Sequence, residues 1–171
     1  MSERACGDCG ECCFALKISE LNKPKYSSCK NYCGGCQIYE DPSRPKACAE
    51  WNCIWIRGAL SNSCRPDKTK LLLWLPDAAT STAWSGTLLM AMETAPGSSR
   101  TLKNQKSIRR LFRSGKNLMV IKFDECRELY LHRRFLAKVM AECSKKGVDV
   151  KKNGNVLMFT SEQAEKIWRS E

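Results

Sequence analysis

The residues with the most evident chemistry in this chain of 171 residues are its twelve cysteines. Four of them, Cys6, Cys9, Cys12 and Cys13, fall within the run Cys-Gly-Asp-Cys-Gly-Glu-Cys-Cys. Two-residue spacings let successive sulfurs turn back toward one point, and the intervening glycines permit positive φ, so that backbone amides can face thiolates. Hydrophobic packing does not require so many adjacent thiols. The run therefore predicts a metal centre.

The expected ligands all lie in the first third of the chain. Cys33 is a reserve candidate, because Cys33-Gly-Gly-Cys36 is itself a two-residue knuckle, and Cys64 is expected to be a free thiol. The adjacent pair Cys12-Cys13 favours two centres, or one ligand beside one free reactive thiol, and the sequence leaves open which four cysteines share an ion. The candidate ligands are Cys6, Cys9, Cys12, Cys13, Cys29, Cys33, Cys36, Cys48 and Cys53.

The type of metal follows from the types of ligand. The single histidine, His132, stands far along the chain, which excludes the common Cys2His2 zinc pattern. Ligation is then dominated by thiolates, with Asp8 or Glu11 as a candidate carboxylate. Such a site suits zinc and iron–sulfur clusters about equally, so both cofactors are expected alternatives.

The composition bounds the class of protein. No basic region followed by an apolar run opens the sequence, and no stretch approaches the roughly 18 apolar residues of a membrane helix. We therefore expect a soluble cytoplasmic protein without membrane contact. In that compartment thiols stay reduced, so a disulfide framework is the weaker alternative to metal binding.

Two parts are expected, in an α+β fold. Residues 1–68 form an irregular cysteine-rich module, whose turn-forming composition gives little apolar burial and which metal would hold in shape. Residues 69–171 form a small α+β domain on which the module docks. Residues 1–65 carry nine Lys and Arg against seven Asp and Glu, so most of the formal net charge of +11 belongs to the second part.

The second part shows ordinary helix and strand signals. Alternation and turn residues predict strands at 70–75, 87–93, 117–123 and 127–132, with residues 76–86 as a loop. Apolar periodicity predicts helices over 101–114, with Leu102 facing inward, and over the segment that ends at Gly147. Strands at 148–150 and 155–159 are expected to flank a type I′ turn at Asn153-Gly154, followed by a capping box and a helix over 161–169. In the first part, short helical turns are expected after Cys12 and over 47–56.

Cations offer a second kind of site. Residues 100–116 carry seven Lys and Arg and no acid. On a helix, four of them form one stripe that could track a phosphate backbone or an acidic protein partner, or remain a solvated face. Arg44 and Arg65 could hydrogen-bond an anionic cluster or an acidic substrate group, or pair with Asp41, Glu40 or Asp67. The stripe consists of Lys103, Lys106, Arg110 and Arg113.

The first part is similar to one known family. Its motifs are Cys6-x-x-Cys9-x-x-Cys12-Cys13, Lys23-Pro24, Cys29, Gly35-Cys36-Gln37-Ile38-Tyr39, Arg44-Pro45-x-x-Cys48, Trp51-x-Cys53-x-Trp55 and Arg65-Pro66-Asp67-Lys68. Over roughly residues 6–75 this order resembles the CxxCxxCC zinc- or iron-chelating domain of the YkgJ-like cysteine-cluster proteins, a motif also found in flagellin lysine methylases. The resemblance implies metal chelation by the cysteines and leaves the metal open.

Three functions follow as hypotheses. The first is a metal-binding cysteine-cluster protein. The second is an iron–sulfur enzyme in redox or methyl-transfer-linked modification of a protein, as the methylase relatives suggest. The third is a nucleic-acid-binding protein that uses the basic helix 100–116. No phosphate loop, serine nucleophile elbow or paired-carboxylate pattern is present, so any catalysis would run through the metal centre or an activated thiol.

Overall fold

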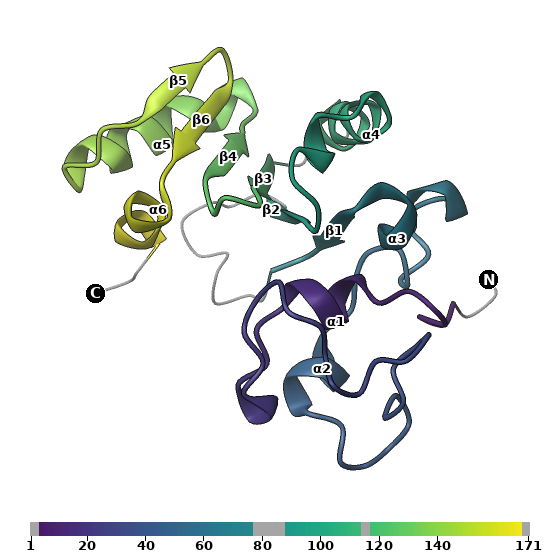
Figure 1. The fold of residues 1–171 in the computed structure, drawn as a ribbon. Coiled ribbons are helices and arrows are strands. Elements are labelled where there is room, and N and C mark those ends of the chain that lie inside the picture. The colour runs from purple at the N-terminus through teal and green to yellow at the C-terminus, as the bar shows by residue number, and fades with distance from the viewer. Residues whose placement is uncertain (1–3, 77–87, 114–116, 169–171) are drawn as a thin grey trace.

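A six-stranded mixed sheet forms the centre of the protein (Figure 1), with strand order β1-β2-β3-β4-β6-β5. The structure is a computed structural model that describes residues 4–76, 88–113 and 117–168. Strands β2 and β3 are parallel, and the other neighbours are antiparallel. The strands are β1 Leu71–Trp74, β2 Leu88–Glu93, β3 Asn117–Ile121, β4 Arg127–Tyr130, β5 Lys151–Asn153 and β6 Val156–Phe159.

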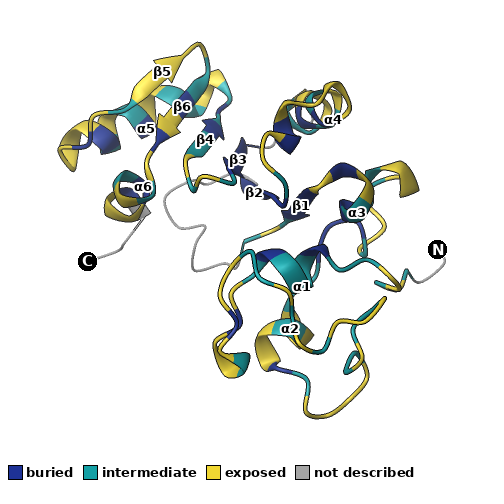
Figure 2. Ribbon diagram, in the orientation of Figure 1, coloured by how far each residue is buried: buried dark blue, intermediate teal, exposed yellow. Residues whose placement is uncertain are grey.

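Helices cover both faces of the sheet. Because side chains alternate along a strand, Leu89 and Leu118 face α4 (Leu102–Arg113), whose Ile108 completes that core. Met119 lies in the core of the opposite face, with residues of α5 (Arg133–Lys145) and α6 (Ser161–Trp168). The central strands are accordingly the most deeply buried part of the chain (Figure 2). The protein is therefore a mixed α and β fold, as expected.

The cysteine-rich part lies beside the β1 side of the sheet (Figure 1) and, within its described residues, adds no strand to it. Its backbone joins the sheet edge where the amide of Ile54 donates to the carbonyl of Leu73 at 2.8 Å. Glu11 accepts hydrogen bonds from Lys70 and Thr94, which ties it to the ends of β1 and β2. Its short helices are α1 Glu11–Ala15, α2 Lys46–Glu50 and α3 Pro66–Thr69.

Several expected elements are confirmed within a residue or two of their bounds. Among them are β1 to β4, α4, α5 and α6. The capping box is also present, because Thr160 Oγ1 accepts from the amide of Gln163 while Gln163 Oε1 accepts from the amide of Thr160. Most of the expected loop over 76–86 lies outside the described residues.

The last hairpin differs from the prediction by its register. Asn153 pairs with Val156, so Gly154 and Asn155 form the turn and the first strand is Lys151–Asn153. The φ angle is positive at Gly154 but not at Asn155, whereas a type I′ turn requires both. Val148, expected in the strand, is instead buried in the core, and its burial shifts the strand along the chain.

Two helix predictions were also wrong in part. The helix expected over 47–56 ends at Glu50, because the following backbone extends and Ile54 bonds to β1. Leu102 is 83% exposed rather than inward. The buried residue of that turn is Asn104, whose amide donates to the carbonyls of Thr69 and Ser98 at 2.7 Å each. Within the described residues, no helix has the length and apolar character needed to cross a bilayer.

Candidate metal centre

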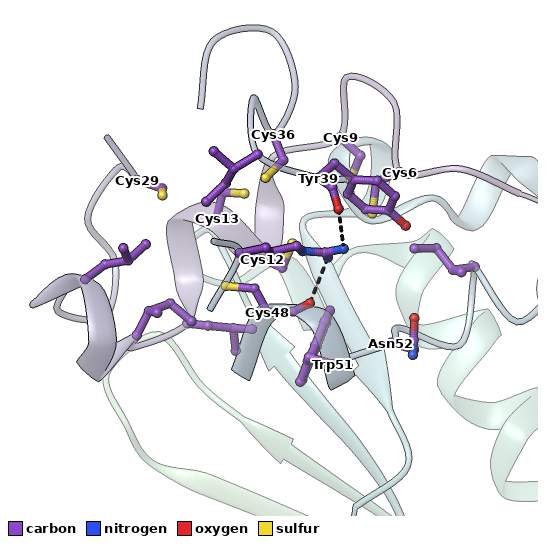
Figure 3. Close-up of a pocket in the computed structure, with 16 residues that line it drawn as sticks. Cys6, Cys9, Cys12, Cys13, Cys29, Cys36, Tyr39, Cys48, Trp51 and Asn52 are labelled. Atoms are coloured by element: carbon purple, nitrogen blue, oxygen red, sulfur yellow. Dashed lines mark hydrogen bonds between the residues drawn. The ribbon is translucent and has the colours of Figure 1, made fainter. Parts of the chain in front are cut away.

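Seven of the nine predicted ligands line a single pocket (Figure 3), with a volume of about 50 Å³. The remaining wall is largely apolar and includes Leu16, Ile18, Ile38, Trp51 and Ile56. A volume of that size holds more than one water-sized sphere, so an ion fits. The seven cysteines are Cys6, Cys9, Cys12, Cys13, Cys29, Cys36 and Cys48.

Local backbone structure gathers these thiols from four segments. The amide of Cys9 donates to the carbonyl of Cys6 at 3.0 Å, which closes a turn around Gly7 at φ 53°. Helix α1 then carries Cys12 and Cys13. Cys36 follows a tight turn in which Gln37 Nε2 donates to the carbonyls of Cys33 and Gly35. Cys48 lies on α2, which begins after Pro45.

The thiols of Cys6, Cys12 and Cys13 form a hydrogen-bonded chain. A hydrogen bond with Cys12 lowers the pKa of Cys6. The hydrogen bond with Cys13 lowers the pKa of Cys12, but the bond with Cys6 and burial together raise it to about 12. The pKa of Cys13 is raised by its bond with Cys12 and by burial. These mutual shifts indicate that the three sulfurs are neighbours.

A second set of thiols gathers around Cys48. Burial raises the pKa of Cys48, and the negative charges of Cys13, Cys29 and Cys36 add to that effect while Arg44 opposes it. Cys13 is thus a neighbour of both sets. Whether the pair Cys12-Cys13 serves two centres, or one ligand beside one free reactive thiol, stays a prediction.

The described cysteine side chains of the pocket do not converge on one point as the ligands of a bound ion would. Among residues 4–76, 88–113 and 117–168, no three His, Cys, Asp or Glu side chains are placed so that they could hold an ion as they stand. All twelve cysteines, each of them in the described part of the chain, are free thiols, which removes the disulfide alternative for this structure. The arrangement is a gathering of thiols in one pocket rather than a finished coordination shell.

Arg44 lies in the wall of the pocket. Its terminal nitrogens donate to the carbonyls of Tyr39 at 2.9 Å and Cys48 at 2.7 Å, the dashed lines of Figure 3, and its guanidinium stacks 4.2 Å from the centre of the Tyr39 ring. Its buried Nε has no hydrogen-bond partner among the described residues. A buried donor without an acceptor is costly. The pairing with Asp41 or Glu40 that the sequence left open is not formed.

Lys23 is a second cation near the thiols, although it does not line the pocket, and only the Lys23-Pro24 pair marked it in the sequence. The residue is 6% exposed, and its ammonium donates to the carbonyls of Phe14, Leu16 and Pro24 at 2.5–3.1 Å. Burial lowers the pKa of Lys23, whereas the charges of Cys29, Cys13, Cys12 and Cys48 raise it. Lys23 therefore caps the end of α1 and brings a positive charge to the thiols.

The remaining predicted ligands lie elsewhere. Cys33 is exposed and does not line the pocket. Cys53 is buried and does not line the pocket, although its charge raises the pKa of Cys6. Burial raises the pKa of Cys53 itself, and hydrogen bonds from the amides of Ile56 and Trp55 oppose this effect. Cys64 lines a separate groove next to α4.

The other predicted cations are also outside the pocket. Arg65 forms ion pairs with Asp67 at 2.6 Å and Asp8 at 2.9 Å, so one of the alternatives left open for it, pairing with Asp67, is confirmed. The ion pair with Asp8 links the start of α3 to the loop between Cys6 and Cys9. The four cations of the predicted stripe lie on α4, and none of them lines the cysteine pocket.

Comparisons of the chain with profiles of known protein families, with curated proteins and with solved structures found no match.

Proposed function

We propose that the cysteine pocket binds a thiophilic metal centre, either zinc or an iron–sulfur cluster, through thiolates. The observation that carries this proposal is that seven cysteines from four separate segments line one pocket. Reduced thiols do not need to gather for the sake of packing, and soft sulfur ligands select zinc and iron–sulfur clusters. Cys53, next to Cys6, is the natural eighth ligand.

The charges around the pocket support the same proposal. Thiolates bound to a divalent ion leave a net negative charge, and the half-buried Arg44 and the buried Lys23 are placed to offset it. The unpartnered Nε of Arg44 would gain an acceptor when the neighbouring sulfurs become thiolates. The apolar wall limits access of water, which strengthens these interactions.

Metal binding would also complete the local structure. A bound ion would displace the thiol protons of Cys12 and Cys13, whose pKa values are raised, and draw the sulfurs together. In this proposal the first part of the chain is a metal-stabilised cysteine-rich module docked on the α+β sheet domain. The cysteine spacing resembles that of the CxxCxxCC zinc- or iron-chelating family, and membership of that family is part of the proposal.

Elemental analysis of anaerobically purified, reduced protein, paired with a visible absorption spectrum, tests the proposal. We expect stoichiometric zinc in a colourless protein, or iron and sulfide in a brown one. The double variant Cys12→Ser/Cys48→Ser should lose metal, whereas the matched variant Cys126→Ser/Cys143→Ser, outside the pocket, should keep it. Wild-type protein that takes up neither zinc nor an iron–sulfur cluster on reconstitution would contradict the proposal.

A further inference from the structure

Helix α4 carries a concentrated positive face that the metal centre does not use. Five of its twelve residues are exposed cations, and none is acidic. The buried side of the helix is formed by Asn104 and Ile108, so the cations occupy the side turned away from the sheet. They are Lys103, Lys106, Arg109, Arg110 and Arg113.

These cations are not neutralised within the described part of the chain. None of the five forms an ion pair with a described carboxylate, although Lys25, Lys46, Arg65, Lys70 and Lys122 elsewhere all do. Like charges four residues apart on a helix, such as Lys106 and Arg110, destabilise it. The helix therefore carries an electrostatic cost that an anionic partner would relieve.

The positive surface continues past the helix into a groove. Arg110 lines this groove together with Arg4 and Arg57, and its volume is about 650 Å³. Arg4 is fixed there, because its guanidinium donates to the carbonyls of Trp55 and Leu60. The cations thus come from three separate segments and meet on one side of the molecule.

The chemistry of this surface favours phosphate over a protein partner. Protein interfaces are built around a buried apolar or aromatic centre, whereas the exposed face of α4 offers only Leu102 as a large apolar side chain. The apolar residues of the groove, among them Leu60 and Leu75, lie beside that face rather than among its cations. Arginine guanidinium groups bind phosphate through paired hydrogen bonds. We propose that α4 and the adjoining groove bind the sugar-phosphate backbone of nucleic acid, an activity beyond metal binding and independent of it.

The spacing gives a quantitative expectation. At about 1.5 Å of rise per residue, the stripe from Lys103 to Arg113 is about 15 Å long. That length matches about four phosphates of one strand at about 3.4 Å each. Neutralising four phosphates predicts a slope of log affinity against log salt of about −3.6 on duplex and about −2.8 on a single strand. No base-reading side chains are required, so binding should depend little on sequence.

Binding of short fluorescently labelled duplex DNA and single-stranded RNA to the full-length, metal-loaded protein, measured over a salt series, tests the proposal. The variant Lys103→Glu/Lys106→Glu/Arg110→Glu/Arg113→Glu should lose binding by at least about 100-fold and flatten the salt slope. A matched variant, Lys138→Glu/Lys145→Glu/Lys151→Glu/Lys152→Glu, changes the net charge equally at exposed lysines of α5 and β5 and should bind as the wild type does. Circular dichroism and metal content check that both variants fold, and the four-glutamine variant of α4 replaces the glutamate one if it does not.

Three outcomes would overturn the proposal. Equal loss of binding in both variants would mean that only net charge matters. Retention of binding in the α4 variant would place the contact elsewhere. Binding of poly-glutamate as tightly as of nucleic acid would favour an acidic protein partner. Loss of metal from the wild type bears on the proposed function alone, because the basic surface contains none of the seven pocket cysteines.

Discussion

At the residue scale, Arg44 is the side chain whose chemistry most depends on the pocket being filled. Its two terminal nitrogens already hold the carbonyls of Tyr39 and Cys48, so the guanidinium cannot turn away, and its Nε stays directed at the buried surroundings. We expect Arg44→Lys and Arg44→Gln to release metal to a competing chelator about tenfold faster, since partners of ligating groups typically change metal affinity by about 10–100-fold.

The lysine variant separates charge from geometry, because lysine keeps the positive charge but lacks the planar guanidinium that donates to two carbonyls. If charge alone matters, Arg44→Lys should behave as the wild type and only Arg44→Gln should release metal faster. The control is Arg57→Gln, an exposed arginine outside the cysteine pocket. Release at the wild-type rate from both Arg44 variants would show that this arginine only packs on Tyr39.

Cys64 should be more acidic than Cys126, another thiol outside the pocket. Burial raises the pKa of Cys64, but hydrogen bonds with Ser61, Ser107 and Ser63 and the charge of Lys103 outweigh it, so that the pKa is lowered. Cys126 shows the opposite shift, because burial and the charge of Asp124 raise its pKa. In metal-loaded protein, the pH midpoint of iodoacetamide alkylation should therefore be lower at Cys64 than at Cys126, as followed by peptide mass spectrometry.

The variant Ser107→Ala removes one of the hydroxyls and should move the Cys64 midpoint to higher pH. A midpoint at Cys64 equal to or above that of Cys126 would contradict the expected direction. An unchanged midpoint in Ser107→Ala would assign the shift to Lys103 and the other two serines instead.

At the element scale, the periodic segments were predictable and the junctions were not. Helices α4 and α5 repeat apolar residues at helical spacing, and the strands alternate, so local sequence is enough to find them. The end of α2 at Glu50 depends on a hydrogen bond between Ile54 and Leu73. No local pattern reports such a contact. The register of β5 likewise depends on Val148 being buried in the core.

The junction between β2 and α4 contains a buried polar network, centred on Glu93. Its carboxylate accepts from Ser99 Oγ and from the amides of Ser99 and Phe123, and it pairs with Lys122 at 3.4 Å. Burial alone would raise the pKa of Glu93, but the hydrogen bonds from Ser99 and Phe123 and the charge of Lys122 outweigh it and lower that pKa. The network is therefore a pH-dependent contribution to stability.

A group whose pKa is lowered on folding contributes stability above its ordinary pKa, here 4.5, and this contribution is lost as the pH falls through the folded-state value. We expect the free energy of unfolding in urea to fall more steeply on acidification in the wild type than in Glu93→Gln. At neutral pH the variant should be less stable by about 3 kcal/mol, because the buried Lys122 loses its closer carboxylate partner and keeps only Glu128 at 3.5 Å. Parallel pH profiles for the two proteins would contradict this account.

At the scale of the whole molecule, the sequence located the candidate centre but not its surroundings. Spacing alone identified the thiols that now line one pocket, because a cluster of cysteines is visible without knowing the fold. The buried ammonium of Lys23 bonds to the backbone of α1, and the guanidinium of Arg44 bonds to the backbone of α2. No cysteine spacing reports either contact. For Cys33 the sequence pattern predicted a pocket ligand, from its two-residue spacing to Cys36, but the side chain is exposed.

The division of the core predicts how the molecule responds to metal removal. The two buried apolar clusters are built mainly from the sheet and from α4 to α6, and the first part contributes few side chains to them, such as Ala15 and Ile54. The sheet domain can thus bury a core without metal, whereas residues 4–65 rely on the proposed centre for their order. Treatment with a chelator under reducing conditions should speed amide hydrogen exchange by at least about tenfold in residues 4–65 and leave Leu118 and Val120 in β3 protected.

Adding zinc back, or rebuilding the iron–sulfur cluster, should restore slow exchange in the same residues. Because Ile54 and Leu73 share a hydrogen bond, the exchange rate in β1 should rise modestly, and the rates in the other strands should stay unchanged. An equal rise across the whole chain would mean that the sheet and the cysteine-rich part unfold as one unit, and no rise at all would mean that metal does not hold the first part in shape.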